Sequence, residues 1–203
     1  MSAYPIVLEG SAISAVVIGG GAVALRKARA LLNAGARVHV IAPDVVPEFE
    51  ILAAERDALR ITPALYETSH LVGATLVIAA TNDAALNAAV ARDAAEKGKL
   101  VNVVNSPELG SFVTPAVHRA GDVVVAVSAG RVPTAAARIR DSIAESIDDR
   151  YADAVRELAT LRRTLLAAGK RDRWAEASAA LVGDDFRERV ESGEFPARVA
   201  AWR

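Results

Sequence analysis

The sequence predicts an α/β protein: a parallel sheet with helices on both faces, followed by a small α+β region and a helical C-terminal tail. Two observations support this fold class. From Ile13 to about Val104, short apolar runs alternate with Ala-rich segments of helical spacing, which is the pattern of a parallel sheet with crossover helices. From Thr134 to about Gly169, the helical pattern is almost uninterrupted.

The first part contains the expected strands and the helices between them. In the first helix, Ala24, Ala28, Leu31 and Leu32 recur at i, i+4, i+7 and i+8, and Gly35 provides the left-handed residue that ends it. Most strands are apolar on both sides, as strands buried on two faces must be. They are expected at residues 13–18, 37–42, 59–62, 75–80 and 100–104.

The pattern changes after Asn105. A loop leads to two expected strands, at 112–118 and 122–128, which form a hairpin-like unit around a turn at 119–121. Pro133 is well placed as the first residue of a helix. A break in the long helical pattern is expected near residues 148 and 149, and helices continue to the end of the chain.

Composition excludes several classes of protein. The 24 Lys and Arg residues are balanced by 25 Asp and Glu, for a net charge of −1, so no basic excess is available for general nucleic-acid binding. The chain has no Cys, which excludes disulfides, thiolate metal ligands and cysteine nucleophiles and favours the cytoplasm. No run approaches the roughly 20 apolar residues of a membrane helix. We expect a cytoplasmic protein with no nucleic-acid partner, no membrane partner and no resident metal.

A glycine turn between the first strand and the first helix is the strongest local signal. Gly19, Gly21 and Ala24 meet the pattern G-x-G-x-x-[G/A] of Rossmann-type dinucleotide-binding units. Gly19 permits the tight turn, Gly21 allows the backbone to approach a pyrophosphate, and the small Ala24 lets the helix lie close to the strand. The N-terminus of that helix favours a phosphate. The sequence therefore predicts a dinucleotide site on a Rossmann-type sheet, with Gly20 inside the turn.

The second strand is followed by Pro43 and Asp44. Asp44 is placed either to bind the ribose hydroxyls or to cap the next turn, and the sequence leaves both readings open. No Arg follows it to bind a 2′-phosphate, which favours NAD over NADP. Arg26 and Lys27 are interpreted as a solvated helix face rather than as phosphate ligands.

Polar residues also follow the fourth and fifth strands, at the edge where open α/β sheets bind ligands. Thr81, Asn82 and Asp83 come after the fourth strand, and Asn105 comes after the fifth. Polar side chains at this edge are candidates for the site, and we expect Thr81, Asn82 and Asp83 to bind the cofactor. Capping of the following helix is the alternative for Asn82 and Asp83.

Together these motifs resemble the precorrin-2 dehydrogenase family, which includes the amino-terminal module of siroheme synthase. The resemblance covers residues 5 to about 145. It depends on Gly19-Gly20-Gly21 with Val23-Ala24 and Arg26-Lys27-Ala28, on Ala79-Ala80-Thr81-Asn82-Asp83, on Asn102-Val103-Val104, on Ser111-Phe112 with Pro115-Ala116, and on Val125-Ala126-Val127-Ser128 followed by Gly130, Pro133 and Arg138-Ile139-Arg140.

The resemblance implies NAD-dependent oxidation of precorrin-2 to sirohydrochlorin in siroheme biosynthesis, joined in some members by insertion of ferrous iron. It implies nucleotide contacts at Ala22, Val23, Pro43 and Asp44, and a tetrapyrrole-facing Ser128. Because precorrin-2 is an octacarboxylate, Arg side chains are expected to bind it. The expected substrate-binding residues are Ser111, Gly130, Arg131, Arg138 and Arg140, and an ordinary helix surface remains the alternative for the three arginines.

Two departures from the family pattern bear on the chemistry. Where the family usually has an aspartate implicated in dehydrogenation and metal insertion, this chain has Asn105, which cannot act as a general base or bind a cation as a carboxylate does. The loop from Ser128 to Pro133 is also one residue shorter than usual. Both departures argue against iron insertion. The candidate catalytic residues are Asn105, Ser128 and His118, with purely structural roles as the alternative for Ser128 and His118.

We expect an NAD-binding domain at residues 1–111, a dimerisation and substrate region at 112–148, and a helical region at 149–203. A homodimer is expected because the hairpin and the long helix expose an apolar stripe too large for the small second region to cover. Two other functions remain open. One is a catalytically inert tetrapyrrole- or nucleotide-binding carrier or sensor, and the other is a different Rossmann oxidoreductase, which leaves the motifs after Asn105 without an explanation.

Overall fold

The computed structural model describes residues 3–203, and the chain forms two compact units. The first unit ends at Thr114, and the second comprises Pro115–Arg203. The hairpin and the C-terminal helices therefore belong to one unit, because they pack against each other. Val123 of the hairpin lies against the apolar core of the C-terminal helices.

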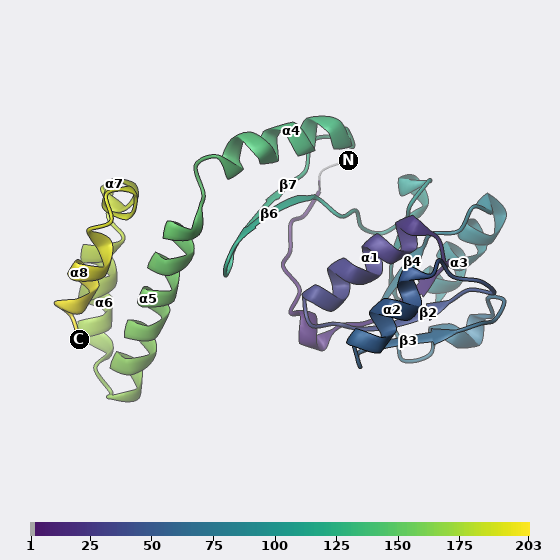
Figure 1. Cartoon of the computed structure of the whole chain (residues 1–203), viewed down its shortest axis with the longest axis horizontal. Coiled ribbons are helices and arrows are strands. Elements are labelled where there is room, and N and C mark those ends of the chain that lie inside the picture. The colour runs from purple at the N-terminus through teal and green to yellow at the C-terminus, as the bar shows by residue number, and fades with distance from the viewer. Residues whose placement is uncertain (1–2) are drawn as a thin grey trace. The chain divides into compact units, whose positions relative to one another are not determined.

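The first unit is built on a parallel five-stranded sheet in the order β3-β2-β1-β4-β5 (Figure 1). The five predicted strands and their parallel pairing are confirmed. The strands are β1 (Ser14–Ile18), β2 (Arg37–Ile41), β3 (Leu59–Thr62), β4 (Leu76–Ala79) and β5 (Leu100–Val103). They are connected by helices α1 (Ala22–Asn33), α2 (Glu48–Glu55) and α3 (Ala84–Glu96), with short 3-10 helices η1 (Gly10–Ala12), η2 (Thr68–Leu71) and η3 (Pro107–Leu109).

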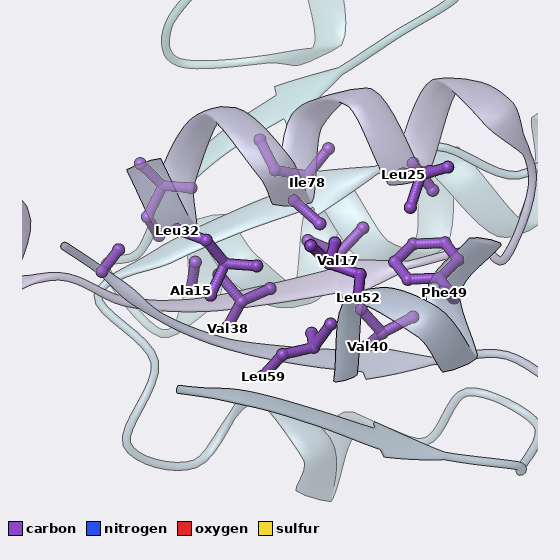
Figure 2. Packing of buried hydrophobic residues seen from close by; sticks show 14 of the residues in the cluster. Ala15, Val17, Leu25, Leu32, Val38, Val40, Phe49, Leu52, Leu59 and Ile78 are labelled. Carbon is purple, nitrogen blue, oxygen red and sulfur yellow. The ribbon is translucent and has the colours of Figure 1, made fainter. Parts of the chain in front are cut away.

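Apolar cores cover both faces of this sheet. On one face, Val17 and Ile78 of the sheet pack with Leu25 of α1 and Phe49 of α2 (Figure 2). On the other face, Val77 lies in a second core with residues of α3 and η2. Burial on both faces explains why the strands are continuously apolar.

The second unit begins with an antiparallel hairpin of β6 (Ala116–Ala120) and β7 (Val123–Val127). The predicted bounds of the first of these strands, 112–118, and of the turn, 119–121, are wrong. Phe112 is instead bonded to β5, since its N–H donates to Val101 O at 3.3 Å and its O accepts from Asn102 Nδ2 at 3.0 Å. The turn is centred later, at Gly121, where φ is 54°.

The helical part of the second unit follows the predicted pattern. α4 (Pro133–Ala144) begins at Pro133, and α5 (Asp149–Ala167) begins after the expected break. Asp148 caps α5 by accepting the Arg150 N–H at 3.0 Å. The chain ends with α6 (Arg171–Leu181), α7 (Phe186–Glu191) and α8 (Phe195–Ala200), which pack on α5 around a core that includes Leu161 and Phe195.

Candidate active site

The glycine turn joins β1 to α1 at the carboxyl edge of the sheet. Gly19 has φ 121°, which side chains rarely adopt, and a Cβ on it would lie 2.5 Å from Ala80 O. A Cβ on Gly20 would overlap the carbonyl oxygen of Asp44 and lie 2.8 Å from the Cα of Val45. Close approach of the neighbouring loops therefore requires glycine at both positions.

Gly21 is different, because no protein contact requires its lack of a side chain. A Cβ there would meet no atom within 4 Å, and its φ of −83° suits any residue. Gly21 precedes α1, and no side chain of the described residues caps this helix. The N–H groups at the start of the helix, including those of Ala22 and Val23, have no intrahelical partner and lie at the positive end of the helix dipole. An open position above such a helix end fits a phosphate of NAD.

Pro43 and Asp44 lie in the loop after β2, beside the glycine turn. Val46 N–H donates to Gly20 O at 2.8 Å, which holds this loop against the turn. Both side chains are exposed. Asp44 does not cap α2, because Pro47 is the residue at that helix end and no side chain of the described residues caps it. The Asp44 carboxylate is therefore available for a ligand at this edge.

Thr81, Asn82 and Asp83 form the loop between β4 and α3. Asn87 Nδ2 donates to Thr81 O at 2.9 Å, and Asn87 Oδ1 accepts the Thr81 N–H at 3.1 Å. Asp83 caps α3, since its Oδ1 accepts two N–H groups of the first turn at 2.8 and 3.0 Å. Asn82 is exposed. Hydrogen bonds from Asn87 of α3 thus fix this loop, and its exposed residues are polar.

Asn87 also belongs to this loop's support, although no sequence motif predicts it. The residue occupies the buried face of α3 together with Val90, Ala91 and Ala94, at i+3, i+4 and i+7. A polar residue in an otherwise apolar helical stripe is the signal that could have identified it.

Of three polar residues at or near β5, one is exposed and two are bonded to the neighbouring backbone. Asn105 follows β5 and is exposed. Ser111 Oγ accepts the Val101 N–H at 2.8 Å, so Ser111 is bound to the edge of β5. Asn102 is buried, its Nδ2 donates to Phe112 O at 3.0 Å, and its Oδ1 has no partner among the described residues.

Lys27 is not part of a solvated helix face, contrary to the prediction. Its side chain is half-buried, and its Nζ donates to Thr114 Oγ1 at 2.5 Å. Burial, with a smaller contribution from the positive charge of Arg26, lowers the pKa of the Lys27 ammonium below its usual range. Lys27 therefore fastens the end of the first unit to α1 instead of facing the glycine turn.

In the second unit, Ser128, Gly130 and Arg131 lie in the loop between β7 and α4. Val132 N–H donates to Ala129 O at 2.8 Å and closes a tight turn. Its central residues have positive φ, 53° at Gly130 and 66° at Arg131. That conformation is unfavourable for an arginine. Ser128 and Arg131 are exposed.

The other basic candidates lie on α4. Arg138 is exposed. Arg140 is held within the unit, because its Nε donates to Asp141 Oδ1 at 2.7 Å and its Nη1 donates to Val117 O at 3.3 Å. Of these two arginines, Arg138 is the better placed for a ligand.

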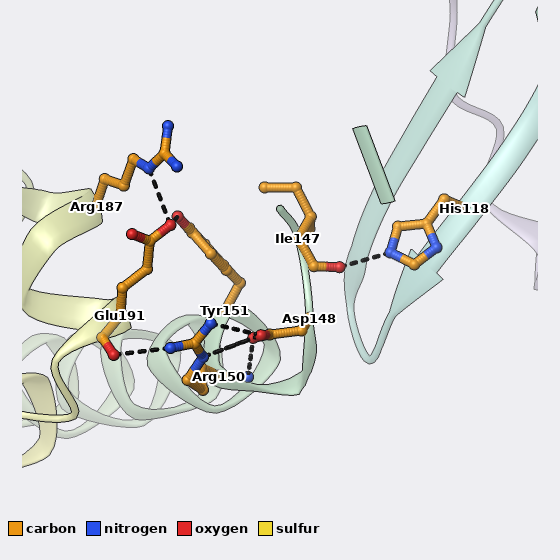
Figure 3. Close-up of polar contacts among 7 residues, drawn as sticks. All are labelled: His118, Ile147, Asp148, Arg150, Tyr151, Arg187 and Glu191. Atoms are coloured by element: carbon orange, nitrogen blue, oxygen red, sulfur yellow. Dashed lines mark hydrogen bonds and ion pairs between the residues drawn. The ribbon is translucent and has the colours of Figure 1, made fainter. Parts of the chain in front are cut away.

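His118 has a structural partner. Its Nε2 lies 2.6 Å from Ile147 O, at the break between α4 and α5 (Figure 3). Beyond this break, Arg150 pairs with Asp148 at 2.7 Å and donates to the backbone oxygen of Glu191 at 2.7 Å. His118 thus joins the hairpin to the segment that leads into the C-terminal helices.

The structure therefore gathers the predicted cofactor residues at one edge of the first unit. The candidates in the second unit form their own group on the hairpin, the loop after it and α4. Within residues 3–203, no group of His, Asp and Glu side chains is arranged to hold a metal ion. The residues gathered at the carboxyl edge of the sheet are Gly19, Gly20, Gly21, Ala22, Val23, Pro43, Asp44, Thr81, Asn82, Asp83 and Asn105.

A parallel sheet in this strand order, with a glycine turn after its central strand, defines a Rossmann-type dinucleotide-binding protein. The family model described as "Putative NAD(P)-binding" matches residues 6–116, which is more than half of the chain. The chain belongs to this NAD(P)-binding family, and the predicted NAD cofactor agrees with it.

Individual relatives place the chain more closely. Over 203 aligned positions it is 38% identical to siroheme synthase of Chromobacterium violaceum, covering 94% of this chain and 43% of that protein. It is 46% identical to siroheme synthase of Ectopseudomonas mendocina over 138 positions, covering 67% and 29%. The chain thus spans less than half the length of these two relatives.

A solved structure resembles the chain over almost its whole length. "SirC, precorrin-2 dehydrogenase" superimposes with a TM-score of 0.71 at 25% identity, covering 98% of this chain and 100% of that one. The resemblance to the precorrin-2 dehydrogenase and siroheme synthase family, inferred from sequence motifs, is confirmed.

Proposed function

We propose that the protein is an NAD-dependent dehydrogenase that oxidises precorrin-2 to sirohydrochlorin in siroheme biosynthesis. The observation that carries this proposal is the glycine turn with its open position at Gly21, over the uncapped start of α1. The full-length likeness to a precorrin-2 dehydrogenase supports the choice of substrate.

The proposed coenzyme site extends along the carboxyl edge of the sheet. NAD supplies a hydride acceptor when it is bound. The N–H groups at the start of α1 hold its phosphates, and the exposed Asp44 carboxylate accepts hydrogen bonds from its ribose. Thr81 and Asn82 border the same edge from β4, and Asn105 borders it from β5.

The proposed substrate residues lie in the second unit. A polycarboxylate substrate needs exposed cationic side chains, and Arg131 and Arg138 are exposed. Arg140 is committed in part to Asp141 and to the hairpin. Ser128 is the stronger candidate for proton handling, because the His118 ring is already bound to Ile147 O.

The direct test is a turnover assay with purified protein, precorrin-2 and NAD, followed by the spectrum of the tetrapyrrole and the absorbance of NADH. The proposal predicts sirohydrochlorin and NADH in equal amounts. Intact NAD binding without turnover would refute the proposed reaction, and absence of NAD binding would refute the proposed site as well.

Ferrous iron enters the proposal only as a second substrate. Asn105 offers an amide where the family usually has a carboxylate, so we propose that iron insertion is weak or absent. Adding ferrous iron to the turnover assay tests this directly, since siroheme and sirohydrochlorin have different spectra. Rapid formation of siroheme would refute it.

A second candidate function is an inert carrier or sensor that binds tetrapyrrole or nucleotide. Asn105 favours it, because an amide cannot accept the proton that oxidation of precorrin-2 releases. Under this reading, Asn105→Asp should create turnover where the natural chain has none. A natural chain that turns over, and gains little from the substitution, would refute it.

We also propose that the protein is a homodimer. The hairpin alternates between half-buried and exposed positions, and Val117 and Val124 on its exposed side are 37% and 42% accessible. The outer face of this two-stranded sheet carries Val117, Val124 and Ala126 beside Arg119. An isolated hairpin with apolar residues exposed on one face is stabilised when that face is covered, and a second copy of the chain offers the same surface. Light scattering should give twice the chain mass for the natural protein and half of that for Val117→Lys with Val124→Lys. A monomeric natural protein would refute the proposal.

The proposed compartment is the cytoplasm, where NAD is available to such an enzyme. Among the helices of residues 3–203, none is both long and apolar enough to cross a membrane. Fractionation of cells with an antibody to the protein tests the location, and recovery outside the cytoplasmic fraction would contradict it.

A further inference from the structure

Buried polar side chains are rare in this chain. Among residues 3–203, only Asn87 and Asn102 are both polar and buried, and Asn87 is 2% exposed. A buried amide costs free energy unless its donors and acceptor are bonded. Asn87 therefore needs a partner that repays its burial.

Its partner is Thr81, in the loop that follows strand β4. Asn87 Nδ2 donates to Thr81 O at 2.9 Å, and Asn87 Oδ1 accepts the Thr81 N–H at 3.1 Å. Both backbone groups of one residue are thus bonded to one side-chain amide, as a neighbouring strand would bond them. Oδ1 also accepts from Thr81 Oγ1 at 2.8 Å. These hydrogen bonds hold Thr81 in one position, two residues beyond the end of β4 at Ala79.

Thr81 in turn lies against the glycine turn. The position of a Cβ on Gly19 is 2.5 Å from Ala80 O and 3.2 Å from Thr81 N. The peptide group between Ala80 and Thr81 therefore packs against the glycine turn, and it cannot move toward the turn without displacing Gly19. Asn87 bonds to Thr81 N–H and to Thr81 O, so its side chain determines the position of this peptide group.

We propose that Asn87 is a positioning residue for the coenzyme, an inference that rests on the proposed function. Asn87 acts through Thr81 and Gly19 and does not itself touch NAD. Without its amide, two partly buried backbone groups of Thr81 lose their partners, and the loop is expected to move toward water to bond them again. That movement shifts the peptide group between Ala80 and Thr81, and with it the glycine turn, away from the coenzyme.

The substitution Asn87→Asp tests this role, because it keeps the shape and replaces the amide donor with a carboxyl group, which is negatively charged when ionised. An ionised carboxylate still accepts from Thr81 N–H and leaves Thr81 O without a donor. Burial raises the pKa of such a carboxyl, so mild acidification restores an O–H that donates to Thr81 O. We expect NAD affinity about tenfold weaker than that of the natural chain at mildly alkaline pH, with recovery at mildly acidic pH.

The natural chain, titrated under the same conditions, is the control for other ionisable groups. Asp83 and Asp93 lie on α3 or at its start, and His70 lies on η2, which packs against α3. Their protonation affects both proteins alike. The recovery on acidification must therefore be specific to Asn87→Asp.

A matched pair of threonine variants separates positioning from general loss of stability. Thr81→Val removes a hydroxyl just beyond the carboxyl end of β4, which bonds to Asn87 Oδ1 at 2.8 Å and accepts the Asp83 N–H at 3.2 Å. Thr75→Val removes a hydroxyl at the amino end of the same strand, which accepts the Ser14 N–H at 3.1 Å and donates to Ser14 O at 3.2 Å. We expect weaker NAD binding for Thr81→Val and unchanged binding for Thr75→Val.

Calorimetric titration with NAD and circular dichroism of each variant decide between the outcomes. If the natural chain binds NAD, and folded Asn87→Asp and Thr81→Val bind equally well at both pH values, the positioning role is overturned. Equal losses in Thr81→Val and Thr75→Val would overturn it too, because the effect would then be global. Failure of the natural chain to bind NAD would instead overturn the proposed function. If Asn87→Asp does not fold, Asn87→Ala removes both hydrogen bonds to the Thr81 backbone without adding a charge, and NAD affinity equal to that of the natural chain in this folded variant would overturn the positioning role.

Discussion

Replacing Gly21 with Ala should remove most coenzyme binding and leave the fold intact. The added Cβ meets no atom within 4 Å, and a φ of −83° suits alanine. Alanine is a poorer residue than glycine before a helix by about 0.5 to 1 kcal/mol. It also restricts the unfolded chain, which returns about 0.4 to 1 kcal/mol. The free energy of unfolding should therefore change by less than about 1 kcal/mol.

The effect on binding is larger because the methyl group occupies the position over the start of α1. A phosphate held there by N–H groups would be pushed away from them. Loss of one hydrogen bond to a charged group costs about 1.5 to 3 kcal/mol, which corresponds to a roughly 10- to 100-fold rise in the Kd for NAD.

Calorimetric titration and thermal denaturation measure the two effects separately. Gly20→Ala is the contrasting variant, because its Cβ would overlap Asp44 O and must displace the loop at a cost of about 1 to 3 kcal/mol. Gly183→Ala is the neutral control. Gly183 lies in the second unit, and the nearest atom to a Cβ added there, Asp185 Oδ1, is 3.5 Å away. A Gly21→Ala protein that binds NAD with the natural Kd would refute the phosphate position.

Three further substitutions test other parts of the structure. Burial, then the positive charges of Arg60 and His70, lowers the pKa of His39 below its usual 6.5. The unfolded chain therefore binds the proton more readily, and stability is full above about pH 6.5 and falls as pH drops through the folded pKa. His39→Gln should flatten that part of a urea-unfolding series, and an unchanged slope would count against it. Phe195→Ala removes a side chain that is 1% exposed and packs edge to face on Phe186 at 5.3 Å. It should cost about 3 to 5 kcal/mol in unfolding experiments without changing the Kd for NAD of the folded protein, and a stability loss under 1 kcal/mol would contradict the packing argument. Asp83→Ala should cost about 1 kcal/mol through loss of the α3 cap, with much of the loss recovered in Asp83→Asn. Equal melting temperatures for the natural chain and Asp83→Ala would exclude a capping role.

The sheet could be predicted because its strands carry their environment in the sequence. All four residues of β4 are buried, and a run of apolar residues bounded by turn residues has few other interpretations in an alternating pattern. The start of the hairpin could not be predicted in the same way. Phe112 is apolar and precedes more apolar residues, yet its backbone is bonded to Val101 and Asn102 of β5. Such a contact depends on tertiary structure and leaves no local pattern.

The site could be predicted where a motif fixes the backbone and not where side chains choose their partners. The glycines and the residues after β2 and β4 follow from the known geometry of the turn and of the sheet edge. Arg140 looked equivalent to Arg138 in the sequence, and only the structure places Arg140 against Asp141 and Val117 O. Asn87 was missed because helical periodicity assigns its position to the core, where an amide is not expected.

The three consecutive glycines separate the demands of folding from those of binding. Gly19 and Gly20 are explained by protein atoms alone, since a Cβ on either would collide with the chain. Gly21 is not, because a side chain there meets nothing of the protein. Asn105, after β5, is exposed, so substitutions there are expected to change the free energy of unfolding little. We therefore expect the Asn105 amide, where the family usually has a carboxylate, to affect turnover and to leave the free energy of unfolding nearly unchanged. Substitutions at Gly21 and Asn105 report on the reaction, whereas those at Gly19, Gly20 and Thr81 report on the reaction and the fold together.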